Sequence, residues 1–266
     1  MKTRLSRGLA LAVLGYACIV AVMAALETTL VFPAPTISRP ELSAAAERFG
    51  AQEVQIDASD GTTLYGWRVG DHPTLVLYFS GNGSSVGAGG LYRLLSAQGL
   101  STLHINYRGY PGSSGSPSEA GIHMDARAAW QEARRTHPAD RIIVMGKSLG
   151  GGVAARLVAE LDEQPAGLVL ESTFTSVVDV AAETYPWLPV RWIMSHRFES
   201  QQVADRIRCP TVVLHGDADT MIGPHHGQAL AAAIADASYV PISGRGHNDR
   251  LLSDKAGLQA LQSLIP

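Results

Sequence analysis

"RIIVMGKSLGGGVAARLVAELDE", residues 141–163, contains two structural patterns in direct succession. Its first part, residues 141–146, is a short apolar run that ends at a glycine, which is typical of a buried strand. Its second part, residues 149–163, has apolar residues at helical spacing after a run of glycines. The stretch therefore predicts a buried strand that turns sharply, at Ser148, into a closely packed helix.

The same alternation continues along most of the chain. Two β-rich runs on either side of Asp60 and Gly61 predict a hairpin. Further apolar strands are expected at residues 74–79, 101–107, 166–171, 211–216 and 237–242, with helices between them. Short apolar strands alternating with helices predict an α/β fold, with a mostly parallel central sheet and helices on both faces.

Composition limits the number of domains and the class of partner. The 266 residues are 46% hydrophobic and 17% charged, which suits one domain of ordinary size, placed here at residues 51–266. The net charge of −3 gives no reason to expect nucleic acid. Two cysteines, Cys18 and Cys209, form no metal or disulfide framework, and no motif calls for a cofactor or a metal.

The N-terminus predicts a membrane segment. Residues 1–7 carry basic side chains, and residues 8–26 carry no charge. Because about 20 apolar residues cross the bilayer hydrocarbon, we expect a single-pass signal anchor, with the basic segment cytoplasmic and the folded domain extracytoplasmic. Residues 27–50 then read as a linker with a short helix. A signal peptide cleaved after Ala24, which would release a secreted or periplasmic protein, is the alternative.

The glycines around Ser148 indicate a nucleophile elbow, a strained turn that exposes a serine above a sheet. The alternative is a serine that only caps the helix. A serine hydroxyl needs a base and an orienting carboxylate to become a nucleophile. His247 lies in a loop after the last strand, and Asp217 and Asp219 follow the strand before it. These positions predict a serine, histidine and aspartate triad.

An acyl-transfer site also needs N–H donors for the oxyanion. Leu149, directly after the serine, should supply one donor from its backbone. The loop "SGNGSS", residues 80–85, should supply the other, with Asn82 preferred over Gly81. A simple polar turn would give the same sequence pattern.

The chain resembles the serine α/β-hydrolases, and within them the Bem46-like branch related to the α/β-hydrolase domain 13 and 17 proteins. The resemblance spans residues 50–263. It rests on these motifs, in this order: "FSGNGSS", "NYRGYPGSSGSPSE", "GKSLGGGVA", "LESTFTSVVDVAAETYPWLPVRWIMSHRFES", "IRCPTVVLHGDADTMI" and "GRGHND". The resemblance implies the α/β-hydrolase fold, Ser148 as nucleophile, Asp219 rather than Asp217 as acid, and His247 as base. Relatives usually carry histidine where this chain has Ser80.

The remaining expectations concern the substrate. Residues 172–208 should contain a short cap over the predicted active site, and its Trp187 and Trp192 are candidates for substrate binding. Tyr107 and Tyr110 should border the opening of the same site and are candidates as well. A small aromatic cap suits an acyl or alkyl chain, so we expect a hydrolase of carboxylic esters or thioesters acting on a small-molecule or acylated substrate. Amide or peptide hydrolysis and a non-catalytic binding protein are the alternatives. The sequence leaves the oligomeric state open.

Overall fold

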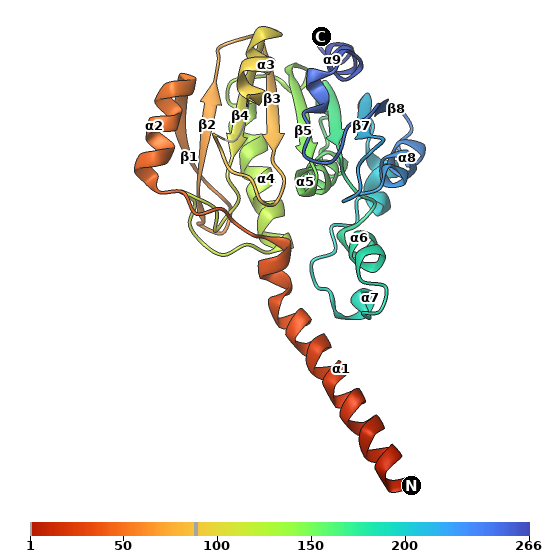
Figure 1. Ribbon diagram of the computed structural model, residues 1–266. Helices are drawn as coiled ribbons and strands as arrows, with labels where there is room; N and C mark the ends of the chain where they lie inside the picture. Colours follow the sequence, from red (N-terminus) through yellow and green to blue (C-terminus); the bar gives the residue numbers. More distant parts are fainter. Residues whose placement is uncertain (1, 88–89) are drawn as a thin grey trace.

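The computed structural model describes residues 2–87 and 90–266, and an eight-stranded sheet lies at its centre (Figure 1). The spatial order is β1-β2-β4-β3-β5-β6-β7-β8. The pairs β1–β2 and β2–β4 are antiparallel, and all the others are parallel. The strands are β1 (Ala51–Asp57), β2 (Thr63–Val69), β3 (Thr74–Phe79), β4 (Leu100–Ile105), β5 (Ile142–Lys147), β6 (Gly167–Glu171), β7 (Thr211–Gly216) and β8 (Ala237–Ile242). The predicted hairpin and mostly parallel sheet are confirmed.

Helices cover both faces of this sheet because successive strand side chains alternate between them. Leu75 and Leu77 of β3 join one buried cluster with helices α4, α5 and α8, whereas Val76 joins a second cluster with α3 and α9. The helices are α3 (Leu91–Ala97), α4 (Glu119–Arg134), α5 (Leu149–Ala159), α8 (Pro224–Ala233) and α9 (Lys255–Gln262), with short 3-10 helices η1 (Ala139–Arg141) and η3 (Leu251–Ser253). Two buried faces explain why these strands read as continuous apolar runs.

The N-terminal part contains two helices, α1 (Lys2–Val31) and α2 (Arg39–Phe49). Of α1, Gly8–Val31 is long and apolar enough to cross a membrane. Helix α2 begins at a capping box formed by Ser38 and Glu41 and buries Leu42 and Ala46 beside Tyr65 and Trp67 of β2. The segment predicted as a linker therefore packs on the domain, because its residues four apart form one apolar helical face.

Between β6 and β7 the chain forms a short cap, defined here as residues 177–198. It contains α6 (Val177–Thr184) and α7 (Val190–Ile193), and η2 (Gln201–Arg206) follows it. The cap lies beside α1, below the carboxyl ends of the parallel strands (Figure 1). This position makes α1 and the cap neighbours although they are far apart in the sequence.

Candidate active site

Ser148 lies at the turn between β5 and α5 with φ 52° and ψ −120°, a strained combination for a residue with a side chain. Two contacts hold it there. Its N–H donates to the Glu171 carbonyl at 2.9 Å, and the Thr173 hydroxyl donates to the Ser148 carbonyl at 2.8 Å. A side chain at Gly146 or Gly150 would overlap neighbouring backbone. Only glycine therefore fits on both sides of this turn.

His247 joins Ser148 to Asp219. Its Nε2 lies 3.1 Å from Ser148 Oγ, and its Nδ1 lies 2.8 Å from Asp219 Oδ2. Because an ionised carboxylate can only accept, the proton of the neutral imidazole belongs on Nδ1, which leaves Nε2 free to accept from the serine hydroxyl. The three residues named from the sequence thus form one hydrogen-bonded line at the carboxyl ends of the strands.

Asp219 is held as an anion despite being only 4% exposed. Burial alone would raise the pKa of its carboxyl group. Hydrogen bonds from His215, His247 and the Ile222 N–H outweigh burial and hold the pKa of Asp219 well below its usual range. Its Oδ1 also accepts from the Met221 N–H at 2.9 Å. The backbone thus fixes one oxygen and turns the other toward the histidine.

Asp217, the other candidate acid, lies on the surface and faces a different group. Its Oδ1 accepts from the Gly244 N–H, which belongs to the turn after β8. Between the two aspartates, the carboxylate within hydrogen-bond distance of His247 is that of Asp219.

Lys147 supports the histidine loop, a role that the sequence analysis did not anticipate. Its Nζ donates to Glu171 Oε1 at 2.8 Å and to the Asp249 carbonyl at 2.9 Å. Asp249 Oδ2 in turn accepts from the Gly246 N–H at 2.8 Å. A lysine directly before the serine thus ties the nucleophile turn to the loop that carries His247. The sequence hint was its placement in an otherwise apolar and glycine-rich stretch.

The predicted oxyanion loop lies against the serine. A Cβ atom built on Gly81 would lie 3.4 Å from the Ser148 Cβ, so this loop passes close to the nucleophile. The amide side chain of Asn82 donates to the Val31 carbonyl at 3.1 Å, which leaves its backbone N–H as the candidate donor. The Leu149 N–H lies in the first turn of α5, where helix N–H groups have no intrahelical acceptor.

Tyr107 and Tyr110, predicted to bind substrate, are buried and hold this loop instead. The Tyr107 hydroxyl donates to the Ser80 carbonyl at 2.9 Å, and the Tyr110 hydroxyl donates to the Asn82 carbonyl at 2.6 Å. Ser80 itself is buried. The two tyrosines therefore support the backbone of the oxyanion loop on either side of Gly81.

A cavity of about 390 Å³ opens at Ser148. Trp187 and Trp192 do not belong to its described lining; they are 54% and 90% exposed. The lining comes from α1, the oxyanion loop, the nucleophile turn, the cap with the residues just before it, and the loop after β7, and it is mostly apolar. It consists of Met23, Ala24, Glu27, Leu30, Val31, Asn82, Ser148, Leu149, Phe174, Val177, Val180, Ala181, Thr184, Tyr185, Leu188, Val190, Ile193, Met194, Met221 and Ile222.

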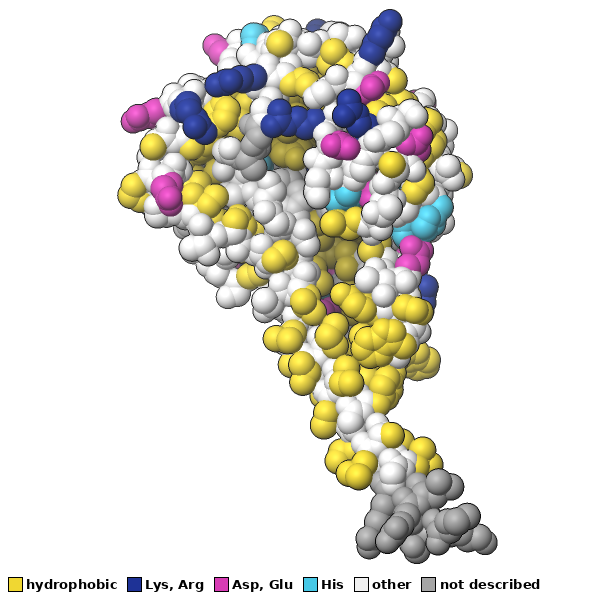
Figure 2. All heavy atoms as spheres, viewed as in Figure 1, with side chains coloured by type: hydrophobic (Ala, Val, Ile, Leu, Met, Phe, Trp, Pro, Cys, Tyr) yellow, Lys and Arg dark blue, Asp and Glu magenta, His cyan; other side chains and the backbone are white. Residues whose placement is uncertain are grey.

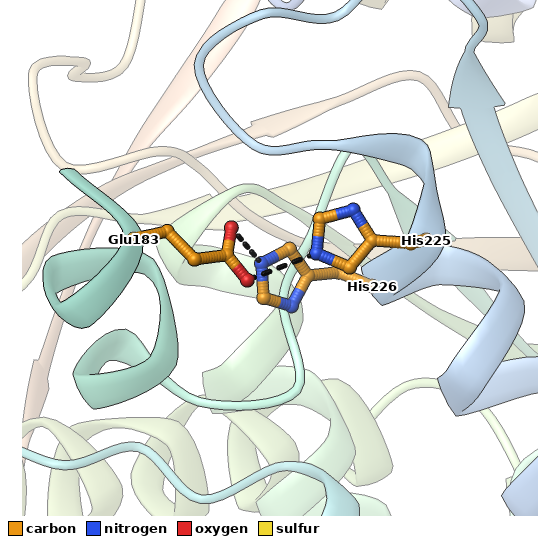
Figure 3. A group of neighbouring side chains, drawn as sticks. All are labelled: Glu183, His225 and His226. Carbon is orange, nitrogen blue, oxygen red and sulfur yellow. Dashed lines mark hydrogen bonds and ion pairs between the residues drawn. The ribbon is translucent and has the colours of Figure 1, made fainter. Parts of the chain in front are cut away.

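One group of side chains has the composition of a metal site, although the sequence predicted none. Glu183 of α6 faces His225 and His226 of α8, with the three ligand atoms within 4.8 Å of one another (Figure 3). Glu183 Oε1 lies 3.0 Å from His225 Nε2, and Oε2 lies 3.3 Å from His226 Nε2. The carboxylate can thus accept from both rings without an ion. These contacts join the cap to α8.

Glu183→Gln should loosen the cap, because an amide has one acceptor oxygen for two histidine donors. We expect backbone amides of α6 to exchange hydrogen about threefold to tenfold faster, a loss of roughly 1 kcal/mol of local stability. Hydrogen exchange measured by mass spectrometry tests this. Glu163→Gln, which removes a surface carboxylate paired with Arg134, should leave α6 unchanged. Equal exchange in α6 of wild type and Glu183→Gln would show that the cluster does not hold the cap.

Comparison with known proteins agrees with this fold. A family profile described as "Serine aminopeptidase, S33" matches residues 71–205, about half of the chain. The chain belongs to the α/β-hydrolases. The chain is 35% identical over 235 residues to the uncharacterized protein Rv2307c of Mycobacterium tuberculosis, covering 85% of this chain and 83% of that protein. It is 30% identical over 251 residues to protein bem46 of Schizosaccharomyces pombe, covering 86% and 82%. The resemblance to the Bem46-like branch is confirmed.

One further relative and one solved structure of similar fold carry an activity in their names. The chain is 33% identical over 178 residues to the lysophosphatidylserine lipase ABHD12 of Danio rerio, covering 60% of this chain and 46% of that protein. Its fold matches the Pyrococcus furiosus esterase Pf2001 with a TM-score of 0.66 at 19% identity, covering 88% and 94% of the two chains. The chain therefore belongs to a superfamily with esterase and lipase members.

Proposed function

We propose that this α/β-hydrolase is a serine hydrolase that cleaves carboxylic esters or thioesters through an acyl-enzyme. The observation that carries the proposal is the line from Ser148 Oγ through His247 to Asp219, with separations of 3.1 and 2.8 Å. His247 Nε2 takes the hydroxyl proton as Oγ attacks the acyl carbon, and Asp219 stabilises the imidazolium that forms. His247 then gives the proton to the leaving group, and water releases the acyl group by the same steps in reverse order.

The developing oxyanion needs two donors near Ser148. We assign these to the backbone N–H groups of Leu149 and Asn82. The Tyr107 and Tyr110 hydroxyls hold the loop carbonyls on the far side, which keeps the loop N–H groups in place before substrate arrives. Donors fixed in advance stabilise the transition state without the cost of reorienting during the reaction.

The cavity favours an acyl chain. Among the lining residues that the structure describes, Glu27 is the one charged side chain, and its oxygens already accept from Ser195 and His196. An aminopeptidase would need an unpaired carboxylate for the amino terminus of its substrate. The apolar lining, the lipase relative and the esterase neighbour together support an ester with a fatty acyl group.

We further infer that α1 stays attached as a membrane anchor, with the catalytic domain extracytoplasmic. The support is structural, because residues of α1 that precede position 25 contact the folded domain. The Tyr16 hydroxyl donates to the Trp187 carbonyl of the cap, and Met23 and Ala24 line the cavity. Cleavage after Ala24 would remove this contact and part of the cavity wall.

A chain-length series tests the proposed activity on the full chain in detergent. We expect kcat/KM for 4-methylumbelliferyl esters to rise about tenfold or more from acetate to octanoate, because each added methylene enters an apolar cavity. A fluorophosphonate probe should label the same preparation. A chain that hydrolyses no ester and takes up no probe would be a binding protein on a hydrolase fold.

A further inference from the structure

The membrane helix forms one wall of the reaction cavity. Met23, Ala24 and Glu27 of α1 line it opposite Val180 and Ala181 of α6. The cavity continues from this seam between α1 and the cap to Ser148. A ligand chain that reaches the serine therefore runs along the same helix that is apolar enough to cross the bilayer.

Two sets of contacts fix the cap along α1. Glu27 is 9% exposed, and its carboxylate accepts from the Ser195 N–H and hydroxyl at 2.8 Å and from the His196 N–H at 2.7 Å. Toward the N-terminus, the Tyr16 hydroxyl donates to the Trp187 carbonyl at 2.8 Å. At about 1.5 Å per residue, these two sites lie about 16 Å apart along the helix axis. The cap thus follows α1 over a length close to the hydrocarbon depth of one leaflet, about 15 Å.

The outer surface of the cap is suited to lipid. Trp187 and Trp192 are exposed and lie in the same short segment as the exposed Tyr185. Figure 2 shows hydrophobic side chains gathered on α1 and on the cap beside it. Tryptophan and tyrosine are enriched where proteins meet the bilayer interface. Arg191 of α7 pairs with Asp179 at 2.9 Å, and a long arginine side chain can extend toward lipid headgroups.

We propose that the cap enters the outer leaflet and that the cavity takes the acyl chain of a bilayer lipid ester sideways, through the seam between α1 and the cap. This proposal rests on the proposed esterase function. The acyl chain of the lipid then passes from the bilayer hydrocarbon into an apolar cavity without crossing water, and its ester group reaches Ser148. Trp187 and Trp192 face the bilayer instead of the substrate, which accounts for their exposure on the outside of the cap.

Blocking the seam tests the route. Full-length wild type, Ala24→Trp and Ala25→Trp are placed in phosphatidylcholine vesicles that contain 4-methylumbelliferyl oleate. The same preparations are assayed with soluble 4-methylumbelliferyl acetate, which shares the leaving group. Ala24 and Ala25 are both exposed, but Ala24 lines the cavity at the seam, whereas Ala25 does not belong to the described lining. An indole at residue 24 should lower the rate with oleate about tenfold more than the rate with acetate, and an indole at residue 25 should change neither rate.

The outcomes separate the route from the activity. Equal effects of Ala24→Trp on both esters, or no effect on oleate, would overturn entry through the seam while the esterase function stands. Failure of wild type to hydrolyse acetate as well as oleate would overturn the proposed function itself.

Fluorescence tests the position of the cap independently of activity. In vesicles of phosphatidylcholine brominated on its acyl chains, tryptophan fluorescence of the full chain should fall, because bromine quenches indoles that it contacts. Trp67 and Trp130 are buried in the domain, so Trp187→Phe with Trp192→Phe should remove most of the quenching. Quenching that persists in the double variant, or none in wild type, would place the cap outside the bilayer.

Discussion

Ser148→Ala should abolish ester hydrolysis, with turnover roughly 10⁶-fold lower, because removing the nucleophile of such a triad eliminates the acyl-enzyme route. Labelling by a fluorophosphonate should disappear as well. Alanine tolerates φ 52° no worse than serine does, and the Ser148 hydroxyl bonds to His247, not to a group that holds the fold together. Unfolding temperature should therefore stay close to that of wild type. Steady-state hydrolysis of 4-methylumbelliferyl acetate and probe labelling measure the two effects.

Ser172→Ala is the matched control for this prediction. Ser172 also has a positive φ, 46°, and is completely buried, and its Oγ has no hydrogen-bond partner within residues 2–87 and 90–266. It should keep both activity and labelling, whereas His247→Ala should lose both. Full labelling of Ser148→Ala at another residue, found by mass spectrometry, would reject Ser148 as the nucleophile.

The sheet and the candidate triad follow from local patterns. Each parallel strand is a short apolar run, and reacting groups of an open α/β sheet gather where such strands end. Ser148, Asp219 and His247 each follow a different strand, β5, β7 and β8. Their approach to one another follows from the parallel sheet, which places the carboxyl ends of these strands at one edge. The sequence predicted the parallel strands, whereas their order in the sheet is known from the structure.

The support around the site depends on contacts between distant segments, which no local pattern contains. Lys147 reaches a carbonyl 102 residues further along, and Glu27 meets the cap 168 residues away. For the same reason the tyrosines and tryptophans could not be assigned correctly to cavity or support. Tyr107 and Trp187 are both aromatic residues near the mouth, yet one is buried under the oxyanion loop and the other lies outside.

Residues 27–50 illustrate a different limit. Prolines near residue 35 are typical of a linker that does not pack on the domain. The pair Leu42 and Ala46 forms a small apolar face, too short to distinguish a docked helix from a free one by periodicity alone. Because Val31 and Phe32 also join the main core, removal of everything before Ala51 would strip side chains from two buried clusters. Anchor and domain are therefore packed as one structure at this point.

Asp219→Asn should lower turnover about 10³-fold to 10⁴-fold, because the amide imposes the wrong histidine tautomer. The backbone decides which way the amide turns. Oδ1 accepts from the N–H groups of Met221 and Ile222, both at 2.9 Å, so the asparagine oxygen stays there and its NH₂ group faces His247 Nδ1. Nδ1 must then accept a hydrogen bond, so the ring proton moves to Nε2. With a proton already on Nε2, the histidine cannot accept the proton of the Ser148 hydroxyl.

Asp217→Asn makes the same chemical change two residues away and serves as its control. Its oxygen can go on accepting from the Gly244 N–H, a bond that does not involve His247, so turnover should change by no more than about threefold. Because the pKa of Asp219 is held low, its carboxylate stays ionised in wild type from pH 6 to pH 8, and the loss in Asp219→Asn should be present at both pH values. Steady-state kinetics at both pH values compare the variants. A larger loss from Asp217→Asn than from Asp219→Asn would assign the orienting acid to the surface aspartate and contradict the geometry of this site.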